Sequence, residues 1–213
     1  MLHGRNPSKL EAVHHSLSTA FPHREFRLII ADASVCEENR FKDFANRVQD
    51  LHLTVVINNA GGTPAWAENG GVFKRLDEYS HKEVMDTVNL NAVFPTMMWN
   101  LLLPQLARNG GRGLVIMIGS LAARGFPLVA AYGAAKAYLR VLSEALRQEI
   151  RMAGYDVEVI YMPLGTVTGV QAIWQEPSLF MPHVTTAARK ILARVGCGRS
   201  EIYHIGRMHC SSC

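Results

Sequence analysis

The sequence predicts an α/β fold, in which a doubly wound parallel β-sheet carries helices on both faces. Two observations support this prediction. Short apolar runs alternate with longer stretches of helical periodicity along the whole chain, as expected for repeated strand–helix units. Most polar residues suited to catalysis or binding fall at or just after the end of an apolar run, and open parallel sheets bind ligands at that carboxyl edge of their strands.

Each element has its own local signal. Asn6 is a favourable N-cap and Pro7 suits the first helical turn, so the first helix is expected to start there. Apolar runs predict the strands, and apolar residues at helical spacing predict the helices. The further expected elements are a strand at 26–31 ending at Asp32, a helix around 41–48, a strand at 53–57, a helix at 80–107, a strand at 114–118, a helix at 130–153, a strand at 157–161, a helix at 185–194 and a short strand at 201–204.

Composition limits the classes of function. The chain has 213 residues, of which 48% are hydrophobic and 19% charged, as expected for one globular domain. The net charge of +4 is scattered rather than gathered into a stripe, so no nucleic-acid partner is expected. No apolar run approaches the roughly 18 residues of a membrane span and no secretory leader opens the chain. The spacing of the cysteines suggests no disulfide framework, so a cytoplasmic location is expected. They are Cys36, Cys197, Cys210 and Cys213.

Three residues in the second half form a constellation suited to proton transfer. Tyr132 and Lys136 lie four positions apart in a helix-forming run, so their side chains leave the same face of the helix. An ammonium beside a phenol stabilises the phenolate. Lowering the pKa of a tyrosine from about 10 to about 7 requires about 4 kcal/mol of preferential stabilisation of the phenolate. Ser120, at the end of a strand, can hydrogen-bond the same carbonyl oxygen. Taken alone, the pair could be an ordinary surface Tyr and Lys; with Ser120 we expect a general acid/base for a ketone–alcohol pair.

These residues, together with Asn58-Asn59-Ala60-Gly61, make the chain similar to the short-chain dehydrogenase/reductases over residues 1 to about 206. The resemblance implies a Rossmann-like sheet and an NAD(P)-dependent oxidoreductase. In that family Tyr132 would be the proton donor and acceptor, Lys136 would lower the tyrosine pKa and hold the nicotinamide ribose, and Ser120 would orient the substrate carbonyl. The segments 177–180 and 194–198 resemble the branch that holds 17-beta-hydroxysteroid dehydrogenases and very-long-chain 3-oxoacyl-CoA reductases.

The resemblance also implies an asparagine that kinks a helix and anchors a water in the proton relay. Asn89, in the context Val-Asn-Leu, matches that residue. Asn91 is the competing candidate two positions later. The local context favours Asn89, which is therefore expected to be part of the catalytic group.

Cofactor contacts are implied at several strand ends. Arg5 stands where relatives place a basic residue against the 2′-phosphate, and arginine suits phosphate as a permanent bidentate cation, so NADP is favoured over NAD. Asp32 resembles the residue that contacts the adenine amino group, with a helix cap as the alternative. Two segments add further expected contacts. The small-residue loop at 58–61 is expected to contact the cofactor through Asn58, Ala60 and Gly61. The segment 163–168 matches the family's nicotinamide-binding pattern imperfectly and is expected to contribute Pro163, Thr166 and Thr168.

The chain departs from the family at its beginning. The family opens with a strand and a Thr-Gly-x-x-x-Gly-x-Gly turn that holds the pyrophosphate, and no such motif occurs here. Residues 1–6 instead resemble the end of the family's second strand. The sheet is therefore expected to lack its first strand and helix, which leaves a central gap that its neighbours must close or leave unpaired. A truncated gene model or an isoform of a longer enzyme would explain this.

The far end of the chain is also atypical. Residues 1–206 are expected to form one domain, and 207–213 an unusual tail. His209, Cys210 and Cys213 could be half of a metal site, but only His204 lies nearby in sequence and a structural zinc site needs four ligands, so no metal is expected.

The sequence supports two functions. The first is an NADP-dependent oxidoreductase that reduces a ketone or oxidises a secondary alcohol. Its expected substrate is a small molecule, with a lipid-like one among the candidates, covered by an apolar lid at 169–182 that includes Trp174, Phe180 and Met181. The second is a catalytically silent relative that acts as an interaction protein. Analogy with relatives suggests a homodimer or homotetramer through the helices at 80–107 and 130–153. An endoplasmic-reticulum location would follow if a full-length parent carried an N-terminal anchor.

Overall fold

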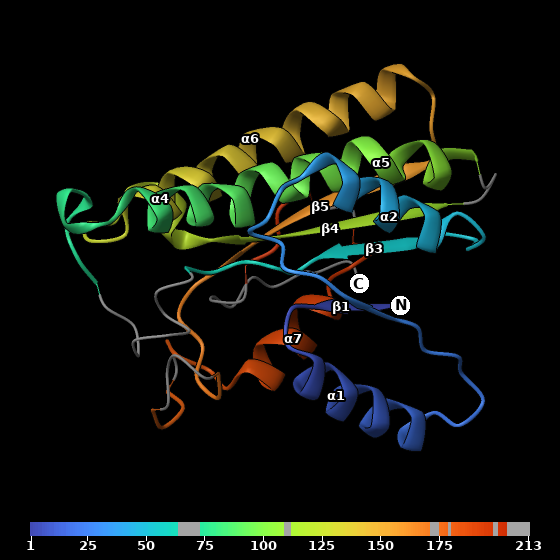
Figure 1. Cartoon of the computed structure of the whole chain (residues 1–213), viewed down its shortest axis with the longest axis horizontal. Coiled ribbons are helices and arrows are strands. Elements are labelled where there is room, and N and C mark those ends of the chain that lie inside the picture. Colours follow the sequence, from blue (N-terminus) through green and yellow to red (C-terminus); the bar gives the residue numbers. More distant parts are fainter. Residues whose placement is uncertain (64–72, 109–111, 171–174, 179, 198–199, 204–213) are drawn as a thin grey trace.

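The structure is a computed structural model of the whole chain, and it describes residues 1–63, 73–108, 112–170, 175–178, 180–197 and 200–203. Parallel strands form a layer with helices on both sides, as the sequence predicts (Figure 1). Helices α4, α5 and α6 lie along one face, and α1 and α7 lie on the other side (Figure 1).

The N-terminal part is a small strand–helix unit. Strand β1 (Leu2–Gly4) pairs in parallel with β2 (Leu28–Ile30), with Leu2 opposite Leu28. Between them runs α1 (Pro7–Ala20), which Asn6 caps by accepting a hydrogen bond from the Lys9 amide at 2.9 Å. Helix α2 (Glu38–Val48) follows β2. The predicted cap and the first helix are therefore confirmed.

The main sheet has the order β3-β4-β5, with all strands parallel. Its strands are β3 (Val55–Asn58), β4 (Gly113–Ser120) and β5 (Val157–Leu164). Strand β4 is central, and its side chains alternate between the two faces. Met117 packs with Trp99 and Leu139 on the α5–α6 side, while Ile116 packs with Ile191 on the α7 side.

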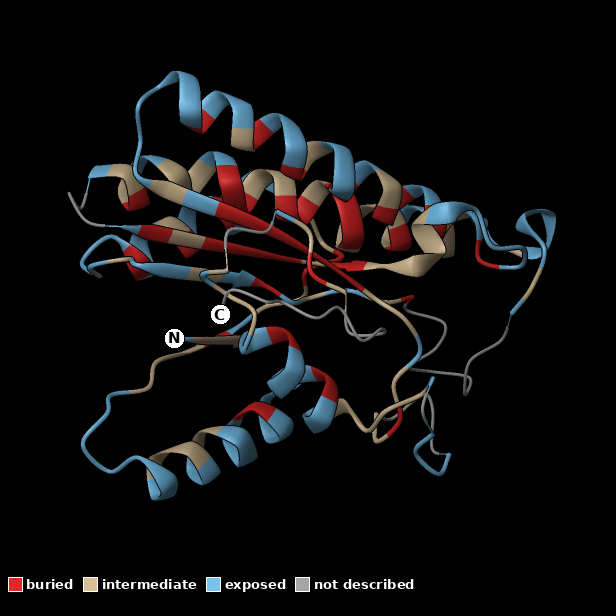
Figure 2. Ribbon diagram, turned by 180° about the vertical axis from the view of Figure 1, so that it is seen from behind, coloured by how far each residue is buried: buried red, intermediate tan, exposed pale blue. Residues whose placement is uncertain are grey.

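The helices of the second half cover these strands. The region expected as one helix over 80–107 consists of α4 (His81–Val88), a π-helical turn at Asn89–Val93 and α5 (Phe94–Arg108). Helix α6 (Ala130–Met152) lies beside α5, and α7 (Val184–Leu192) is separate from both (Figure 1). Residues on the sides of these helices that face the sheet are mostly buried, and those on the outer sides are mostly exposed (Figure 2).

Three shorter features complete the description. One-turn 3₁₀ helices occur at Leu76–Glu78 and at Leu121–Arg124. The strand expected at 201–204 is reduced to a parallel bridge between Tyr161 and Glu201, and its last residue lies outside the described part of the chain. None of the helices among the described residues combines the length and apolarity needed to cross a membrane.

The sheet is split in two. Among the described residues, β1 pairs only with β2, and β3 pairs only with β4. The side of β3 remote from β4 and the strand β1 both line one groove of about 1010 Å³. The sequence predicted a missing central strand without deciding whether its neighbours would close together. In the structure they do not.

Candidate active site

The end of β4 and the start of α6 bring Ser120 and Tyr132 together. Ser120 ends β4 and caps the following 3₁₀ turn, its hydroxyl accepting a hydrogen bond from the Ala122 amide at 3.1 Å. Helix α6 packs tightly on that turn, because a Cβ on Gly133 would lie 2.7 Å from the Ala122 carbonyl oxygen. Glycine at this position therefore lets the helix bring Tyr132 within hydrogen-bonding range of the Ser120 side chain.

Lys136 lies one turn further along α6 and is buried, with 3% of its surface exposed. Its Nζ donates a hydrogen bond to the Ile118 carbonyl oxygen at 2.9 Å and lies 5.8 Å from the centre of the Tyr132 ring. Burying an ammonium favours its neutral form, so the pKa of Lys136 falls to about 8.

The pKa of Tyr132 is raised, whereas the sequence led us to expect a lowered pKa. Burial raises the pKa of Tyr132, and the hydrogen bond from Ser120 offsets that only in part. The Lys136 ammonium donates a hydrogen bond to a backbone carbonyl oxygen, and burial is the largest influence on the pKa of Tyr132. In the chain alone Tyr132 is thus a neutral phenol, poised to give a proton rather than to take one.

Asn91 is the asparagine that reaches this group. It is fully buried in the π-helical turn. Its Nδ2 donates to the carbonyl oxygens of Gly62 at 2.7 Å and Thr87 at 2.8 Å, and its Oδ1 accepts from the Gly62 amide at 3.0 Å. It thereby fixes the loop after β3 to the helix.

Asn89, which the sequence context favoured, lies elsewhere. Its Nδ2 donates to the Ser34 carbonyl oxygen at 3.0 Å, in the loop after β2. The expectation that Asn89 belongs to the catalytic group is therefore wrong in its geometry. One sequence signal could have identified the right residue. The buried stripe of α5 runs through Pro95, Met98 and Leu102, and four residues before Pro95 it reaches Asn91.

The loop after β3 approaches Lys136 closely. Asn58 ends β3 with its side chain buried against the Met117 sulfur, and Ala60 and Gly61 follow. A Cβ on Gly61 would lie 2.8 Å from Lys136 Nζ and 3.1 Å from Asn91 Oδ1. Only glycine leaves this space open, so the loop after β3, the Lys136 ammonium and the Asn91 amide lie close together.

The predicted nicotinamide segment follows β5. Pro163 lies within the strand and is buried, whereas Thr166 is exposed in the loop after it. Thr168 is fully buried and held by its backbone, which accepts from the Val184 amide at 2.9 Å. Its Oγ1 is buried without a hydrogen-bond partner, an arrangement that favours a ligand group as its partner. The threonine hydroxyl of Thr63, at the end of the β3 loop, is in the same situation and was not anticipated from the sequence.

Arg5 and Asp32 follow the carboxyl ends of β1 and β2. The Arg5 guanidinium lies 3.8 Å from the Asp32 carboxylate, and both are partly exposed. Partial burial raises the pKa of Asp32, but hydrogen bonds from Ser34 and the charge of Arg5 outweigh this and lower it overall. Arg5 is thus available to an anion at this edge, with Asp32 as a competing partner.

Comparison with known proteins agrees with this geometry. The sequence pattern of the short chain dehydrogenase family matches residues 1–177. A very-long-chain 3-oxoacyl-CoA reductase-like protein of Arabidopsis thaliana is 33% identical over 204 residues, which cover 93% of this chain and 62% of that protein. A very-long-chain 3-oxoacyl-CoA reductase of Lodderomyces elongisporus is 27% identical, over 92% of this chain and 55% of that protein. The chain thus spans about 60% of the length of these relatives.

Solved structures share the fold. A short chain dehydrogenase from Salmonella enterica superposes with a TM-score of 0.78 at 19% identity, covering 95% of this chain and 84% of that one. A putative short chain dehydrogenase from Escherichia coli, solved in complex with NADPH, superposes with a TM-score of 0.73 at 21% identity. The match covers 88% of this chain and 76% of that one. The family's sequence pattern matches most of the chain, and the chain has a parallel α/β fold in which Ser120, Tyr132 and Lys136 converge at the strand ends. The chain therefore belongs to the short-chain dehydrogenases.

Proposed function

We propose that the chain carries the catalytic site of an NADP-dependent oxidoreductase that interconverts a ketone and a secondary alcohol by hydride transfer. The observation that carries this proposal is the convergence of Ser120, Tyr132, Lys136 and Asn91 at one edge of the sheet. Family membership supports an oxidoreductase dependent on a nicotinamide cofactor. The preference for NADP rests on the residues of this chain, and the substrate class rests on those residues together with the names of the relatives.

In the reducing direction Tyr132 donates its phenolic proton to the substrate oxygen, which Ser120 also hydrogen-bonds. The neutral state of Tyr132 in the chain fits a proton donor. Lys136, with its pKa of about 8, stabilises the phenolate left behind and is close enough in acidity to return a proton near neutral pH. Asn91 positions the loop at Gly61, over which the ammonium lies. A bound nicotinamide cofactor supplies the hydride.

The described residues fit such a cofactor at its two ends. At the nicotinamide end, Thr168 offers a buried hydroxyl without a partner, and Gly61 leaves space beside Lys136. At the adenosine end, Arg5 offers a cation beside Asp32, which favours NADP because a 2′-phosphate pairs with a guanidinium. Pro163 and Thr166 lie in and just after β5 and complete the predicted contacts.

An apolar ketone is the substrate class that we favour. Of the segment expected to form a lid, Phe180 is largely exposed and Met181 is half-buried, while Trp174 lies outside the described residues. Two relatives are named for very-long-chain 3-oxoacyl-CoA, a ketone on a long apolar chain. A 3-oxoacyl thioester and a steroid ketone are therefore the first substrates to try.

Self-association through α4 and α6 is part of the proposal. An apolar cavity of about 690 Å³ lies between them, lined by Val84, Val88, Ala92 and Ala131 among others. Tyr138 and Val141 on α6 are exposed. An apolar helix face of this kind favours pairing with the same face of a second copy.

The test follows the hydride. NADPH that carries deuterium at the transferring position of the nicotinamide ring is incubated with the chain and an apolar ketone, and the alcohol is analysed by mass spectrometry. We expect the deuterium on the carbinol carbon. Cofactor binding without transfer to any ketone would instead favour a catalytically silent relative.

A further inference from the structure

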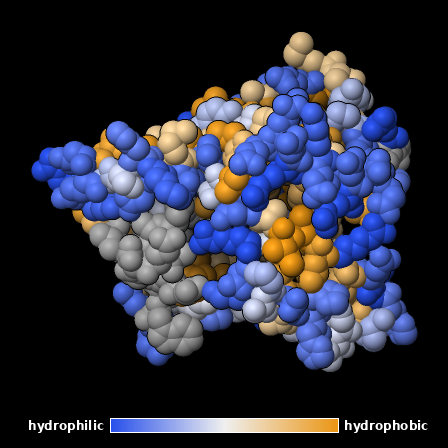
Figure 3. Space-filling model, viewed as in Figure 1, coloured by the Kyte–Doolittle hydropathy of each residue, from blue (hydrophilic) through white to orange (hydrophobic). Residues whose placement is uncertain are grey.

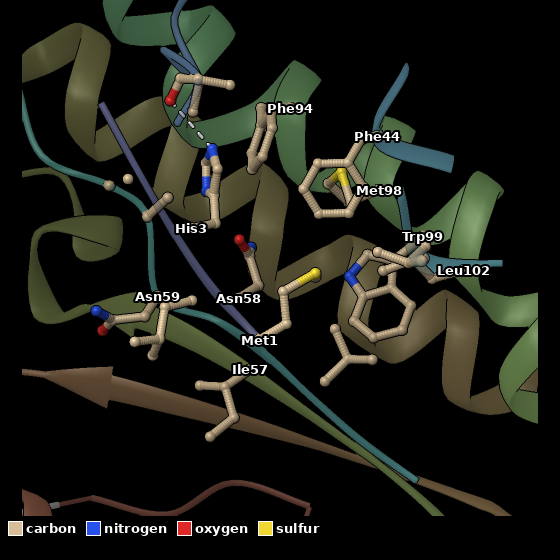
Figure 4. Close-up of a pocket in the computed structure, with 18 of the residues that line it drawn as sticks. Met1, His3, Phe44, Ile57, Asn58, Asn59, Phe94, Met98, Trp99 and Leu102 are labelled. Atoms are coloured by element: carbon tan, nitrogen blue, oxygen red, sulfur yellow. Dashed lines mark hydrogen bonds between the residues drawn. The ribbon is translucent and has the colours of Figure 1, made fainter. Parts of the chain in front are cut away.

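The central strand β4 has different neighbours on its two sides. On the β3 side, Asn58 donates a hydrogen bond to the Met117 sulfur and lies beside the apolar groove that Figure 4 shows. An apolar patch is visible over this groove in Figure 3. On the β5 side, opposite Met117, stands Tyr161, a buried tyrosine with 1% of its surface exposed. The proton transfer proposed above gives this titratable side chain no role.

The ring of Tyr161 fills the space over Gly119, which lies on the same face of β4 as Met117. A Cβ on Gly119 would lie 2.2 Å from Cζ of the ring and 2.3 Å from its hydroxyl oxygen, so a glycine is needed there. The main chain of Tyr161 is fixed as well, because its amide donates to Ser200 at 3.0 Å and its carbonyl oxygen accepts from Ile202 at 3.1 Å. The hydroxyl is therefore held in one place at the end of the sheet.

The Tyr161 hydroxyl connects two segments of the candidate active site. It donates a hydrogen bond to the Lys136 carbonyl oxygen on α6 at 3.4 Å, and it accepts one from the backbone amide of Ser120. Lys136 is thus attached to this end of the sheet twice, since its own Nζ donates to the Ile118 carbonyl oxygen at 2.9 Å. These bonds join the end of β4 to the part of α6 that carries Tyr132 and Lys136.

Both bonds of the Tyr161 hydroxyl require that it keep its proton. A phenolate would accept from Ser120 but has no proton to donate to Lys136. Burial is the main influence and raises the pKa of Tyr161 to about 12, although the hydrogen bond from the Ser120 amide lowers it. The charges of Glu201 and Arg140 act on the hydroxyl in opposite directions. The hydroxyl therefore stays neutral at and well above pH 7.

We infer that Tyr161 is a positioning residue, whose hydroxyl aligns Ser120 with Tyr132 by tying the end of β4 to α6. It touches neither the reacting atoms nor the cofactor in this role and acts through Ser120. The inference deepens the proposed function, on which it rests, by adding a residue that keeps the proton donor and the second hydrogen-bonding group in register.

A positioning role and a purely structural role predict different results. The hydrogen bond from Ser120 lowers the pKa of Tyr132, so a displaced Ser120 should raise that pKa. If Tyr161 only fills space in the core, removing its hydroxyl should lower the free energy of unfolding and leave the pKa of Tyr132 unchanged. The pKa of Tyr132 therefore separates the two roles.

The test is Tyr161→Phe, which keeps the ring over Gly119 and removes only the hydroxyl. NMR of the cofactor-free chain, labelled with ¹³C at tyrosine Cζ, follows the titration of Tyr132, and the signal that disappears in Tyr132→Phe assigns it. We expect the pKa of Tyr132 to rise and the Ser120 amide to exchange with solvent at least about tenfold faster. Tyr138→Phe is the matched control on α6, because its hydroxyl bonds Thr96, and it should change neither.

Reduction of an apolar ketone gives a second readout. The loss of alignment should lower kcat of Tyr161→Phe about threefold to tenfold. KM for the ketone and Kd for NADPH should stay within about twofold of the wild type, because the hydroxyl aligns the reacting groups and binds neither ligand. Tyr138→Phe should keep the wild-type kcat.

Three results would overturn the inference. The first is an unchanged titration of Tyr132 or unchanged exchange at Ser120 in Tyr161→Phe. The second is a wild-type kcat in that variant. The third needs no variant, and is the absence of a nuclear Overhauser effect between the Tyr161 hydroxyl proton and the Ser120 amide proton in the folded wild type. Lack of any reductase activity in the wild type would instead refute the proposed function, and the two NMR measurements would still decide whether Tyr161 positions Ser120.

Discussion

Replacing Asn91 by leucine tests the correction that the structure makes to the sequence-based choice. The change keeps the approximate size of the side chain and removes its three hydrogen bonds to Gly62 and Thr87. Asn91 has 0% of its surface exposed, so water cannot replace these bonds. A net loss of about 0.5–1.5 kcal/mol for each bond, plus the cost of the unsatisfied partners, predicts about 2–4 kcal/mol of destabilisation.

The matched control is Asn89→Leu. Asn89 makes one side-chain hydrogen bond, to Ser34, and is only partly buried. We therefore expect Asn89→Leu to destabilise the fold by about 0.5–1.5 kcal/mol. Urea unfolding measures both variants, and the Asn91 change should lower the midpoint by about 1–2 M. Equal effects of the two changes, or an Asn91→Leu effect below about 1 kcal/mol, would refute the role of Asn91 as the residue that ties the β3 loop to the helix.

Two further predictions concern charged groups. The pKa of Lys136 is about 8 in the folded chain and 10.5 ordinarily, so between these values the unfolded state binds more protons and the free energy of unfolding should rise with pH. Between pH 8 and 10 the free energy of unfolding of the wild type should rise by up to about 3 kcal/mol relative to that of Lys136→Met. Urea titrations measure both proteins, and parallel pH profiles would contradict the burial of the ammonium. Arg5→Asp replaces a phosphate-pairing cation by an anion and should reduce the preference for NADPH over NADH by about tenfold to a hundredfold. An unchanged ratio of dissociation constants, measured by calorimetry, would show that Arg5 does not meet the 2′-phosphate.

Much of the fold could be predicted because its signals are local. The Asn6 cap, the apolar runs of β4 and β5, and the four-residue spacing of Tyr132 and Lys136 each specify structure within one element. The parallel arrangement follows from the alternation of these elements. The site then follows, because the carboxyl ends of parallel strands share one edge.

The features that were missed depend on contacts between distant segments. The choice between Asn89 and Asn91 depends on the phase of the helix at a π-helical turn, and the local Val-Asn-Leu context does not report that phase. The raised pKa of Tyr132 results from its burial in the folded chain, which the hydrogen bond from Ser120 offsets only in part. Whether the gap in the sheet closes depends on packing of α2 and α5 around His3 and Phe94, which no strand pattern encodes.

The most direct test of the catalytic assignment is the reduction of an apolar ketone by Tyr132→Phe, followed through NADPH oxidation. Tyr138→Phe is the matched control, because Tyr138 lies on the same helix, is exposed and, among the residues that the structure describes, hydrogen-bonds Thr96. Loss of the phenolic proton donor should lower turnover at least about a hundredfold, with cofactor affinity nearly unchanged, while Tyr138→Phe stays close to wild type. Tyr132→Phe activity above about a tenth of wild type would contradict the assignment of Tyr132 as the general acid.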